Sequence, residues 1–235
     1  AGLPILESNH AVQRAHDVQV ALMTPVELST RFPWLNVDGV AGGSLGLADE
    51  GWFDAYALLQ AFRRKARSLG VEEVAGEVVE IERDSDRATG VRLADGRRIE
   101  ADWVVNAAGP RAAGVAAMAG VALPVSPRKR MVFHFDCRTR IESPLTIDTS
   151  GVYFRPEGPN YIAGSSPHGE QPDPETLDLE VDRSWFEEVV WPAIAHRVPA
   201  FEAIRLLDAW AGHYEVNTLD HNAIIGPHPA VPNFL

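Results

Sequence analysis

The sequence predicts an α+β protein, and three features of the chain support this class. Residues 71–101 alternate between apolar and polar side chains and contain an Asp95-Gly96 turn, a pattern typical of an antiparallel meander. Residues 55–68 carry apolar side chains at helical spacing, between Asp54 as N-cap and Gly70 as C-cap. Residues 124–136 and 204–217 are predicted as two further, long strands.

The N-terminal region is predicted to be mainly helical. Apolar residues recur near helical spacing from Ile5 to Met23, which predicts one amphipathic helix over this range. Thr24 and Pro25 are typical of the N-cap and the first position of a second, short helix. Residues 40–47 are rich in glycine and are expected to be extended.

The central region predicts three strands, over residues 71–82, 89–94 and 97–101, and then a fourth. Trp103 to Asn106 is a short apolar run, typical of a strand that is buried on both faces. Ala107-Ala108-Gly109-Pro110 follows. Because these residues have little or no side chain, a flat or phosphorylated ligand can approach their backbone closely. Tight packing of the strand against the next, Ala-rich helix is the simpler explanation of the same residues.

The C-terminal half predicts a hairpin, an exposed loop, a helix and a final strand. The hairpin joins residues 151–156 to residues 161–164, and residues 165–181 have the composition of an exposed loop. Asp182 is a suitable N-cap for the helix that follows. Residues 223–226 are apolar and predict a short strand.

Composition excludes several classes of function. The net charge of −12 and the pI near 5.1 argue against non-specific binding to nucleic acids or anionic lipids. The single cysteine, Cys137, excludes an internal disulfide and a cysteine zinc cluster, and it indicates a reducing compartment. No run approaches the ~18 apolar residues of a membrane helix, and no histidine pair has the spacing of a metal site. We therefore expect a cytoplasmic protein with neither a membrane span nor a bound metal.

Five sequence blocks together resemble one family. They are RFPWL, LGLADEGWFD, VVNAAGP, GVYFRPEG and NAIIGPHP, and each block alone is weak evidence. In this order, from about Leu28 to Leu235, they resemble FAD-dependent oxidoreductases of the D-amino-acid oxidase superfamily. That superfamily includes glycine oxidase and sarcosine oxidase, and the likeness is strongest to its branch of FAD-dependent oxidoreductase domain-containing proteins.

The resemblance implies FAD as cofactor and a small-molecule amine or amino acid as substrate, with the electron acceptor left open. It implies a FAD-binding domain formed by residues 49–117 and 223–235, and a substrate-binding domain formed by residues 1–48 and 118–222. The G-x-G-x-x-G turn of such domains has no match, since Gly42 to Gly46 lacks the spacing. We therefore expect an internal piece of a longer enzyme, which by itself is inactive and binds FAD poorly or not at all. A small binding protein that has lost its nucleotide site is the alternative.

The resemblance also implies five cofactor-binding positions. Val78 matches a position whose backbone holds the adenine in the family. Ala107, Ala108 and Gly109 match the turn beside the flavin. Arg111 stands where many relatives carry Trp, so the packing or the charge at this position is changed.

The predicted catalytic residues are His213, Tyr214 and Arg155. In related enzymes Leu-Arg follows the Trp-Ala-Gly block, and that Arg binds the substrate carboxylate. This chain has His213 and Tyr214 instead. They could act as a proton acceptor and a phenol donor near the substrate nitrogen, or they could pack at a domain junction. Arg155 could replace the missing anchor or form a surface ion pair. Loss of the family Arg also favours an alternative function, a flavoprotein-derived module for binding or complex assembly without catalysis.

Overall fold

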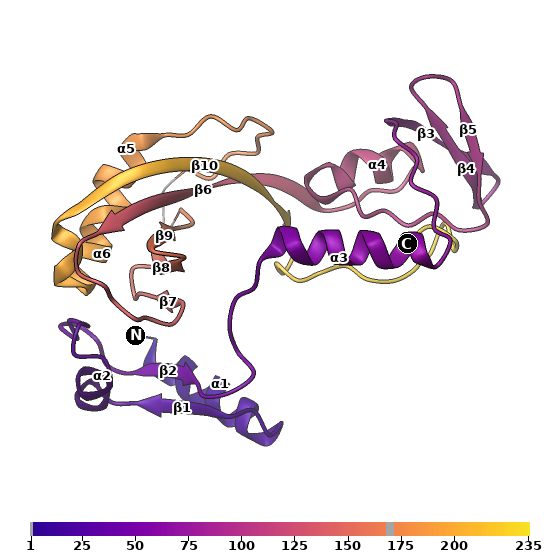
Figure 1. Ribbon diagram of the computed structural model, residues 1–235. Helices are drawn as coiled ribbons and strands as arrows, with labels where there is room; N and C mark the ends of the chain where they lie inside the picture. Colours follow the sequence, from indigo (N-terminus) through magenta and orange to yellow (C-terminus); the bar gives the residue numbers. More distant parts are fainter. Residues whose placement is uncertain (1, 168–171) are drawn as a thin grey trace. The chain divides into compact units, whose positions relative to one another are not determined.

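The computed structural model describes residues 2–167 and 172–235 (Figure 1). Residues 168–171, in the predicted loop, lie outside the described residues. The chain forms two compact units. Unit 1 comprises residues 1–54, 131–171 and 180–211, and unit 2 comprises residues 55–130, 172–179 and 212–235. Both units combine helices with antiparallel strands, which confirms the α+β class. The assignment of residue ranges to FAD and substrate binding stays a prediction.

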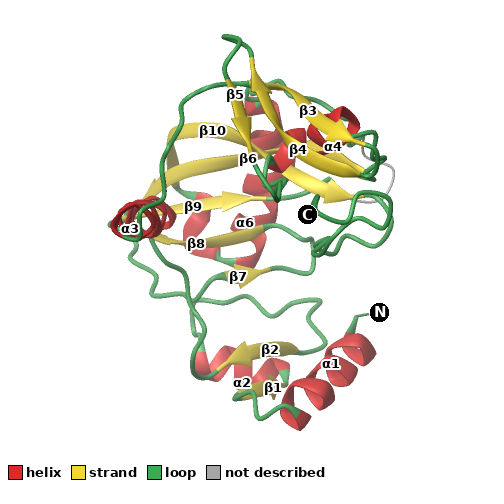
Figure 2. Ribbon diagram, turned by 90° about the vertical axis from the view of Figure 1, so that its right-hand side faces the viewer, coloured by secondary structure: helices red, strands yellow, loops and turns green. Residues whose placement is uncertain are grey.

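The N-terminal part of unit 1 contains α1 (Leu3–Ala15), β1 (Val20–Met23), α2 (Pro25–Arg31) and β2 (Gly43–Gly46). Figure 2 shows both helices beside the antiparallel β1–β2 pair. The prediction of one helix from Ile5 to Met23 is wrong in its second half. Asp17 takes a left-handed φ of 60°, and the residues after it form a strand because β2 supplies a pairing partner. Periodicity alone does not reveal such a distant partner.

The start of α2 is fixed by a capping box, as Thr24 predicted. The Glu27 backbone N–H donates to the Thr24 hydroxyl at 3.4 Å, and the Glu27 carboxylate accepts the Thr24 backbone N–H at 2.7 Å. This reciprocal pair satisfies two backbone donors that the first helical turn leaves without partners.

The main sheet has the strand order β10-β6-β9-β8-β7. Its strands are β6 (Val125–Cys137), β7 (Thr146–Ile147), β8 (Tyr153–Glu157), β9 (Asn160–Gly164) and β10 (Ile204–Asn217). The predicted hairpin is confirmed, since β8 and β9 pair with Glu157 opposite Asn160. The strand predicted over residues 204–217 has the same bounds in the structure. Strands β6 and β10 each contribute one part to unit 1 and one part to unit 2.

The core of unit 1 is aromatic. Phe201 is fully buried, and its ring lies 5.2 Å from that of Phe135, 5.4 Å from Phe154 and 5.1 Å from Tyr161 between centroids. These rings lie between the sheet and a helical segment made of α5 (Arg183–Trp185), a π-helical turn (Phe186–Val190), α6 (Trp191–Arg197) and a 3-10 turn (Pro199–Glu202). Asp182 caps this segment as predicted, accepting the Ser184 backbone N–H at 2.9 Å.

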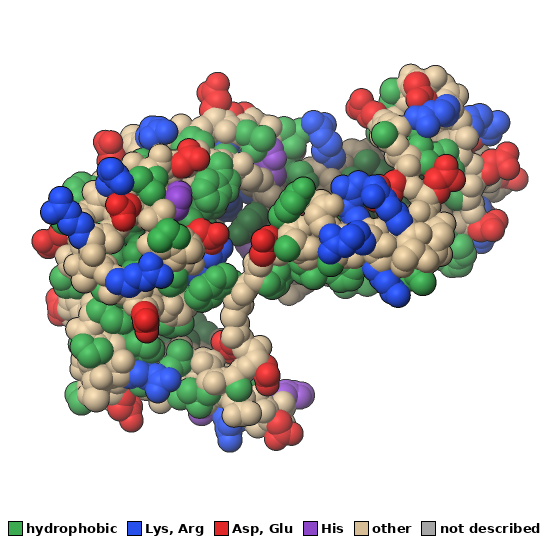
Figure 3. Space-filling view, viewed as in Figure 1, with side chains coloured by type: hydrophobic (Ala, Val, Ile, Leu, Met, Phe, Trp, Pro, Cys, Tyr) green, Lys and Arg blue, Asp and Glu red, His purple; other side chains and the backbone are tan. Residues whose placement is uncertain are grey.

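Unit 2 contains α3 (Ala55–Ser68), β3 (Val78–Asp84), β4 (Arg87–Leu93), β5 (Arg98–Glu100), a 3-10 turn (Gly109–Arg111) and α4 (Ala112–Met118). The meander is confirmed, with β4 between β3 and β5, although β3 begins at Val78. The bounds of α3 are those predicted, and Figure 3 shows its Lys and Arg side chains gathered on the surface. A small core joins β3 and β4 to α4 and Phe234.

Two predicted strands are wrong. Val104 makes a single parallel bridge to Phe234, supported by backbone bonds from Asn106 N to Leu235 O and from Leu235 N to Val104 O. Trp103 and Val105 are 57% and 68% exposed, because no described element covers the face that they share, whereas Val104 on the other face packs against the small core. Residues 223–226 form no strand in the described chain. Their apolar side chains line a cavity instead.

Candidate functional site

A cavity of about 680 Å³ lies within unit 2. Two segments that are far apart in the sequence form most of its wall, residues 106–112 and residues 221–229. The end of β10 and the connection from α4 to β6 complete it. This volume lies in the range of about 300–1,000 Å³ that is typical of small-molecule sites.

The first wall is a corner of small residues held by Asn106. The Asn106 side-chain amide donates to the Ala112 carbonyl at 2.9 Å, and its oxygen accepts the Ala108 N–H at 3.3 Å. Gly109 takes a φ of +54°, and a Cβ placed there would have no atom within 4 Å. The side-chain-free face of Gly109 therefore opens on empty space, and a larger residue would strain the backbone.

The second wall begins with a cross-linked turn at the end of β10. The buried Asn217 amide donates to the Asp220 carboxylate at 2.7 Å and to the Asn222 carbonyl at 3.0 Å. The backbone N–H of Asn222 in turn donates to Asp220, which is the first cause of the lowered pKa of that carboxyl. These bonds hold His221 at a left-handed φ of 62° on the cavity wall.

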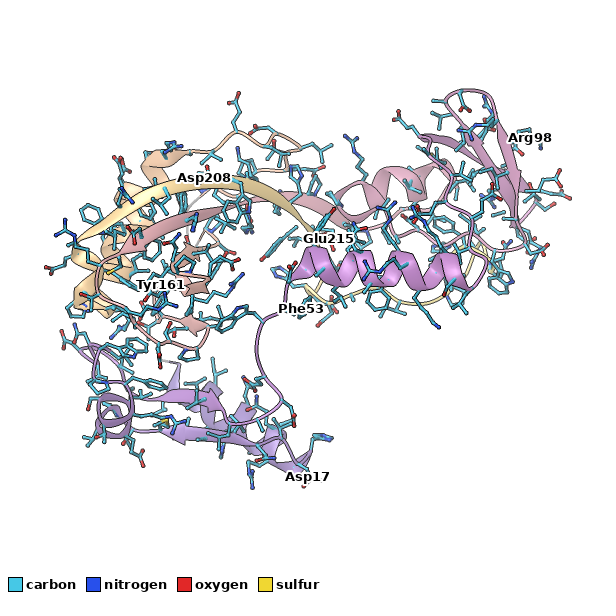
Figure 4. All side chains as sticks on the ribbon, in the orientation of Figure 1. Asp17, Phe53, Arg98, Tyr161, Asp208 and Glu215 are labelled. Atoms are coloured by element: carbon cyan, nitrogen blue, oxygen red, sulfur yellow. The ribbon has the colours of Figure 1, made fainter. Side chains whose placement is uncertain are left out.

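A second cavity, of about 360 Å³, is lined by Tyr214, Glu215, Val216 and His221. Glu215 and His221 line the first cavity as well, so these two residues border both cavities. Figure 4 labels Glu215 near the C-terminal end of β10. Among the described residues that line either cavity, Glu215 is the only side chain of the Asp, Glu, Lys or Arg types.

Two of the five predicted cofactor-binding residues line the larger cavity, namely Ala107 and Gly109. Ala108 lies between them in the same corner. Val78 is the half-buried first residue of β3, and Arg111 is exposed at the end of the 3-10 turn. Neither of them lines the cavity.

The side chains of His213 and Tyr214 do not share one site in the structure. They are neighbours on β10, and successive side chains of a strand point to opposite faces. The His213 Nε2 lies 3.1 Å from the Asp178 carbonyl, whereas the Tyr214 ring lies beneath the Arg130 guanidinium, 5.8 Å from it. Tyr214 lines the smaller cavity, and His213 lines neither.

Arg155 belongs to unit 1 and lines neither cavity. Its guanidinium forms an ion pair with Glu157 and lies 5.5 Å from the centre of the Trp52 ring. It also donates to the Pro156 carbonyl at 2.8 Å. The charge of Arg155 is therefore already engaged by its own hairpin and by Trp52.

Sequence reasoning missed Glu215, His221 and the rest of the 222–229 wall as site residues. The block NAIIGPHP was singled out only for its resemblance, and its apolar residues predicted a strand. For Glu215, the available signal was the alternation of β10, which places it on the same face as Asn217. Only the tertiary fold places Glu215 and Asn217 on the same cavity wall as the small-residue corner at 107–109.

The family model for FAD dependent oxidoreductases, DAO, matches residues 1–235, and the chain belongs to this family. It is 43% identical to FAD-dependent oxidoreductase domain-containing protein 1 of Xenopus laevis over 99% of this chain and 53% of that protein. The mouse protein of the same name is 41% identical over 97% of this chain and 53% of its own length. The chain thus spans about half the length of the curated relatives that it matches.

Solved structures share the fold. L-proline dehydrogenase from P. horikoshii superposes with a TM-score of 0.86 at 26% identity, over 97% of this chain and 61% of that one. Glycine oxidase from Geobacillus kaustophilus gives a TM-score of 0.81 at 24% identity, over 97% of this chain and 60% of that one. At this identity the likeness supports the fold alone. The predicted superfamily is confirmed. Within the described residues, no helix has both the length and the apolar character that a bilayer crossing requires.

Proposed function

We propose that the protein oxidises a C–N bond of an amine or amino acid with FAD, and that the cavity beside Ala107 to Gly109 receives the flavin. One observation carries this proposal. In a chain that belongs to an FAD-dependent family, the side-chain-free face of Gly109 borders a cavity of about 680 Å³ with nothing within 4 Å of its missing Cβ.

The residues of the cavity fit a flavin. A flat ring system needs contact with backbone that carries little side chain, and the 107–109 corner offers this. Ala112, Val121 and Leu123 supply apolar wall, and Asn106 and Asn217 place amide groups within the lining. A mostly apolar wall with a few polar groups is typical of cofactor sites. Ala107, Ala108 and Gly109 would hold the ring.

When bound, the flavin supplies a hydride acceptor at its N5 atom. The chain supplies the surroundings of the substrate. Glu215 and His221 border both cavities, so they are the groups placed to accept a proton from an amine bound there. Tyr214 lines the smaller cavity, where its phenol can donate a hydrogen bond to the substrate.

Flavin titration tests the proposal. The measurements are made on the full-length protein that contains this chain, because the G-x-G-x-x-G unit has no match in these 235 residues. We expect added FAD to bind it, with quenching of the FAD fluorescence and a shifted absorbance near 450 nm, and amines or N-methyl amino acids to bleach that band without oxygen. Gly109→Ala should weaken FAD binding at least about tenfold. Gly96→Ala is the matched control, because Gly96 also has a positive φ, of +87°, and open space around it, but lies on the β4–β5 turn. Equal FAD affinity of the two variants, or no FAD binding by the wild type, would refute the proposal.

A second candidate is a binding or assembly module without turnover. The feature that favours it is Tyr214, which stands where the resembling enzymes carry the Arg that grips the carboxylate. The neighbouring cation, Arg130, is paired with Asp173 at 2.8 and 2.9 Å. FAD binding without reduction by any amine or amino acid would support this candidate, and reduction by a defined substrate would exclude it.

A further inference from the structure

We infer that the substrate of this site is an amine that binds as a cation at Glu215, and that a substrate carboxylate is not its anchor. The inference rests on the proposed function and specifies its substrate class. The two adjoining cavities, the pairing of the nearby cations and the surroundings of Glu215 support it.

The charge of the cavity walls points to a cation. Among their described residues, Glu215 is the only side chain of the Asp, Glu, Lys or Arg types, and it lines both cavities. A carboxylate attracts an alkylammonium group and repels a second carboxylate at short range.

Two cations of β6, Lys129 and Arg130, are already paired with carboxylates of the chain. Arg130, which lies over the Tyr214 ring, donates two hydrogen bonds to Asp173. Lys129 forms an ion pair with Asp178 at 2.5 Å. A substrate carboxylate would have to displace Asp173 to reach Arg130, and that exchange would break a bidentate pair.

The acidic segment that pairs these cations is itself held along β6. Glu175 forms an antiparallel bridge to Arg128 and accepts the Ser126 hydroxyl at 2.8 Å. The Thr176 backbone N–H donates to the Pro127 carbonyl at 3.3 Å. Because backbone and side-chain bonds fix this segment, its aspartates remain in place when a small ligand enters the cavities.

The Glu215 carboxylate is available to a ligand. No residue of the described chain forms a salt bridge or a side-chain hydrogen bond with it, and its side chain is exposed on the cavity wall. A carboxylate that lacks a protein partner and lines two cavities can offer both oxygens to an N–H donor.

A matched pair of probes tests the inference. Pyrrolidine and L-proline share one ring and differ by a carboxylate, so at neutral pH the first is a cation and the second is a zwitterion. We would measure their binding to the 235-residue chain by ligand-observed NMR. We expect pyrrolidine to bind at least about tenfold more tightly than L-proline, since a hydrogen bond to a charged group contributes that much or more.

Three variants locate the effect. Glu215→Gln keeps the shape of the side chain and should abolish the preference for pyrrolidine. Glu215→Arg should reverse it in favour of L-proline. Asp208→Asn is the control, because Asp208 is an exposed carboxylate on the same strand that lines neither cavity, and Figure 4 labels both residues. It should behave as the wild type, and circular dichroism would check that all variants fold.

Several results would overturn the inference. They are tighter binding of L-proline by the wild type, no binding of either probe, or a preference for pyrrolidine that survives Glu215→Gln. Failure of the proposed function is separate, because it appears as absent flavin binding in the FAD titration. Flavin reduction that requires a substrate carboxylate would support the proposed function and overturn this inference.

Discussion

Replacing Arg197 with Met should destabilise unit 1 severely. Arg197 is 4% exposed, at the end of α6. Its Nε donates to the Asp148 carboxylate at 2.5 Å, and its Nη1 donates to the carbonyls of Asn36 and, at 3.2 Å, Asp38. One guanidinium thus ties α6 to two loops that lie far apart in the sequence.

The expected cost is about 3–5 kcal/mol, the range for removing one partner of a buried ion pair. Methionine fills a similar volume but donates no hydrogen bond, so the Asp148 carboxylate would stay buried without its cation. Burial alone raises the pKa of Asp148, but the hydroxyl and N–H of Ser150 together with Arg197 outweigh it and lower the pKa. Two backbone carbonyls would also lose their donor, and each such buried group adds to the cost.

Urea unfolding followed by tryptophan fluorescence would measure the loss. Arg205→Met is the matched control, because the Arg205 side chain is 74% exposed and lies 3.3 Å from the Asp136 carboxylate. Exposed pairs of this kind contribute about 0–1 kcal/mol. A second probe, such as far-ultraviolet circular dichroism, would show whether unit 1 unfolds in one transition.

The double variant Arg197→Met with Asp148→Asn separates the cost of the unpaired Asp148 charge from the cost of the lost hydrogen-bond donor. Because the second change removes the buried charge, we expect it to recover part of the stability lost in the single Met variant. The reasoning is refuted if Arg197→Met costs no more than Arg205→Met, or if adding Asp148→Asn destabilises the protein as much as it does in the wild type.

Three further predictions follow from the same structure. The lowered pKa of Asp148 stabilises the folded protein above the ordinary pKa of 3.8, and this stability is lost as the pH falls through the pKa of the folded state. Acid should therefore destabilise the wild type more steeply than Asp148→Asn, and acid-induced unfolding of the two proteins would measure the difference. Asn233→Ala should cost about 2–4 kcal/mol in urea unfolding, because this fully buried amide bonds both backbone groups of Ala88 and the Asp102 carbonyl at 2.7–2.9 Å; a loss below that of an exposed Asn variant would contradict this. Gly109→Ala should lower stability by about 1–2 kcal/mol through its left-handed φ, and a thermal melt unchanged from the wild type would disprove the strain.

Local signals in the sequence predicted much of the fold. The capping box at Thr24, the bounds of α3 and the β8–β9 hairpin each depend on residues within a few positions of one another. Neighbouring side chains and turn residues decide such elements, so a single sequence is enough to place them.

Elements that depend on distant partners were predicted poorly. The segment from Val20 to Met23 has helical spacing, but β2 makes it a strand. Trp103 and Val105 are apolar but exposed, because no described element covers the face that their side chains share. The 223–226 segment is apolar, but in the described chain it forms no strand and lines a cavity.

For the site, the sequence by itself determined the small-residue corner at 107–109 and, through resemblance, the family of FAD-dependent oxidoreductases, which the comparison confirms. Only the tertiary structure decided that Glu215 and His221 line both cavities and that Arg155 is held by Glu157 and Trp52. The physical reason is the distance along the sequence between the interacting residues. Backbone conformation at a Gly or a cap is a local property, whereas the charge of a cavity depends on which side chains folding brings onto its wall and which of them are already paired.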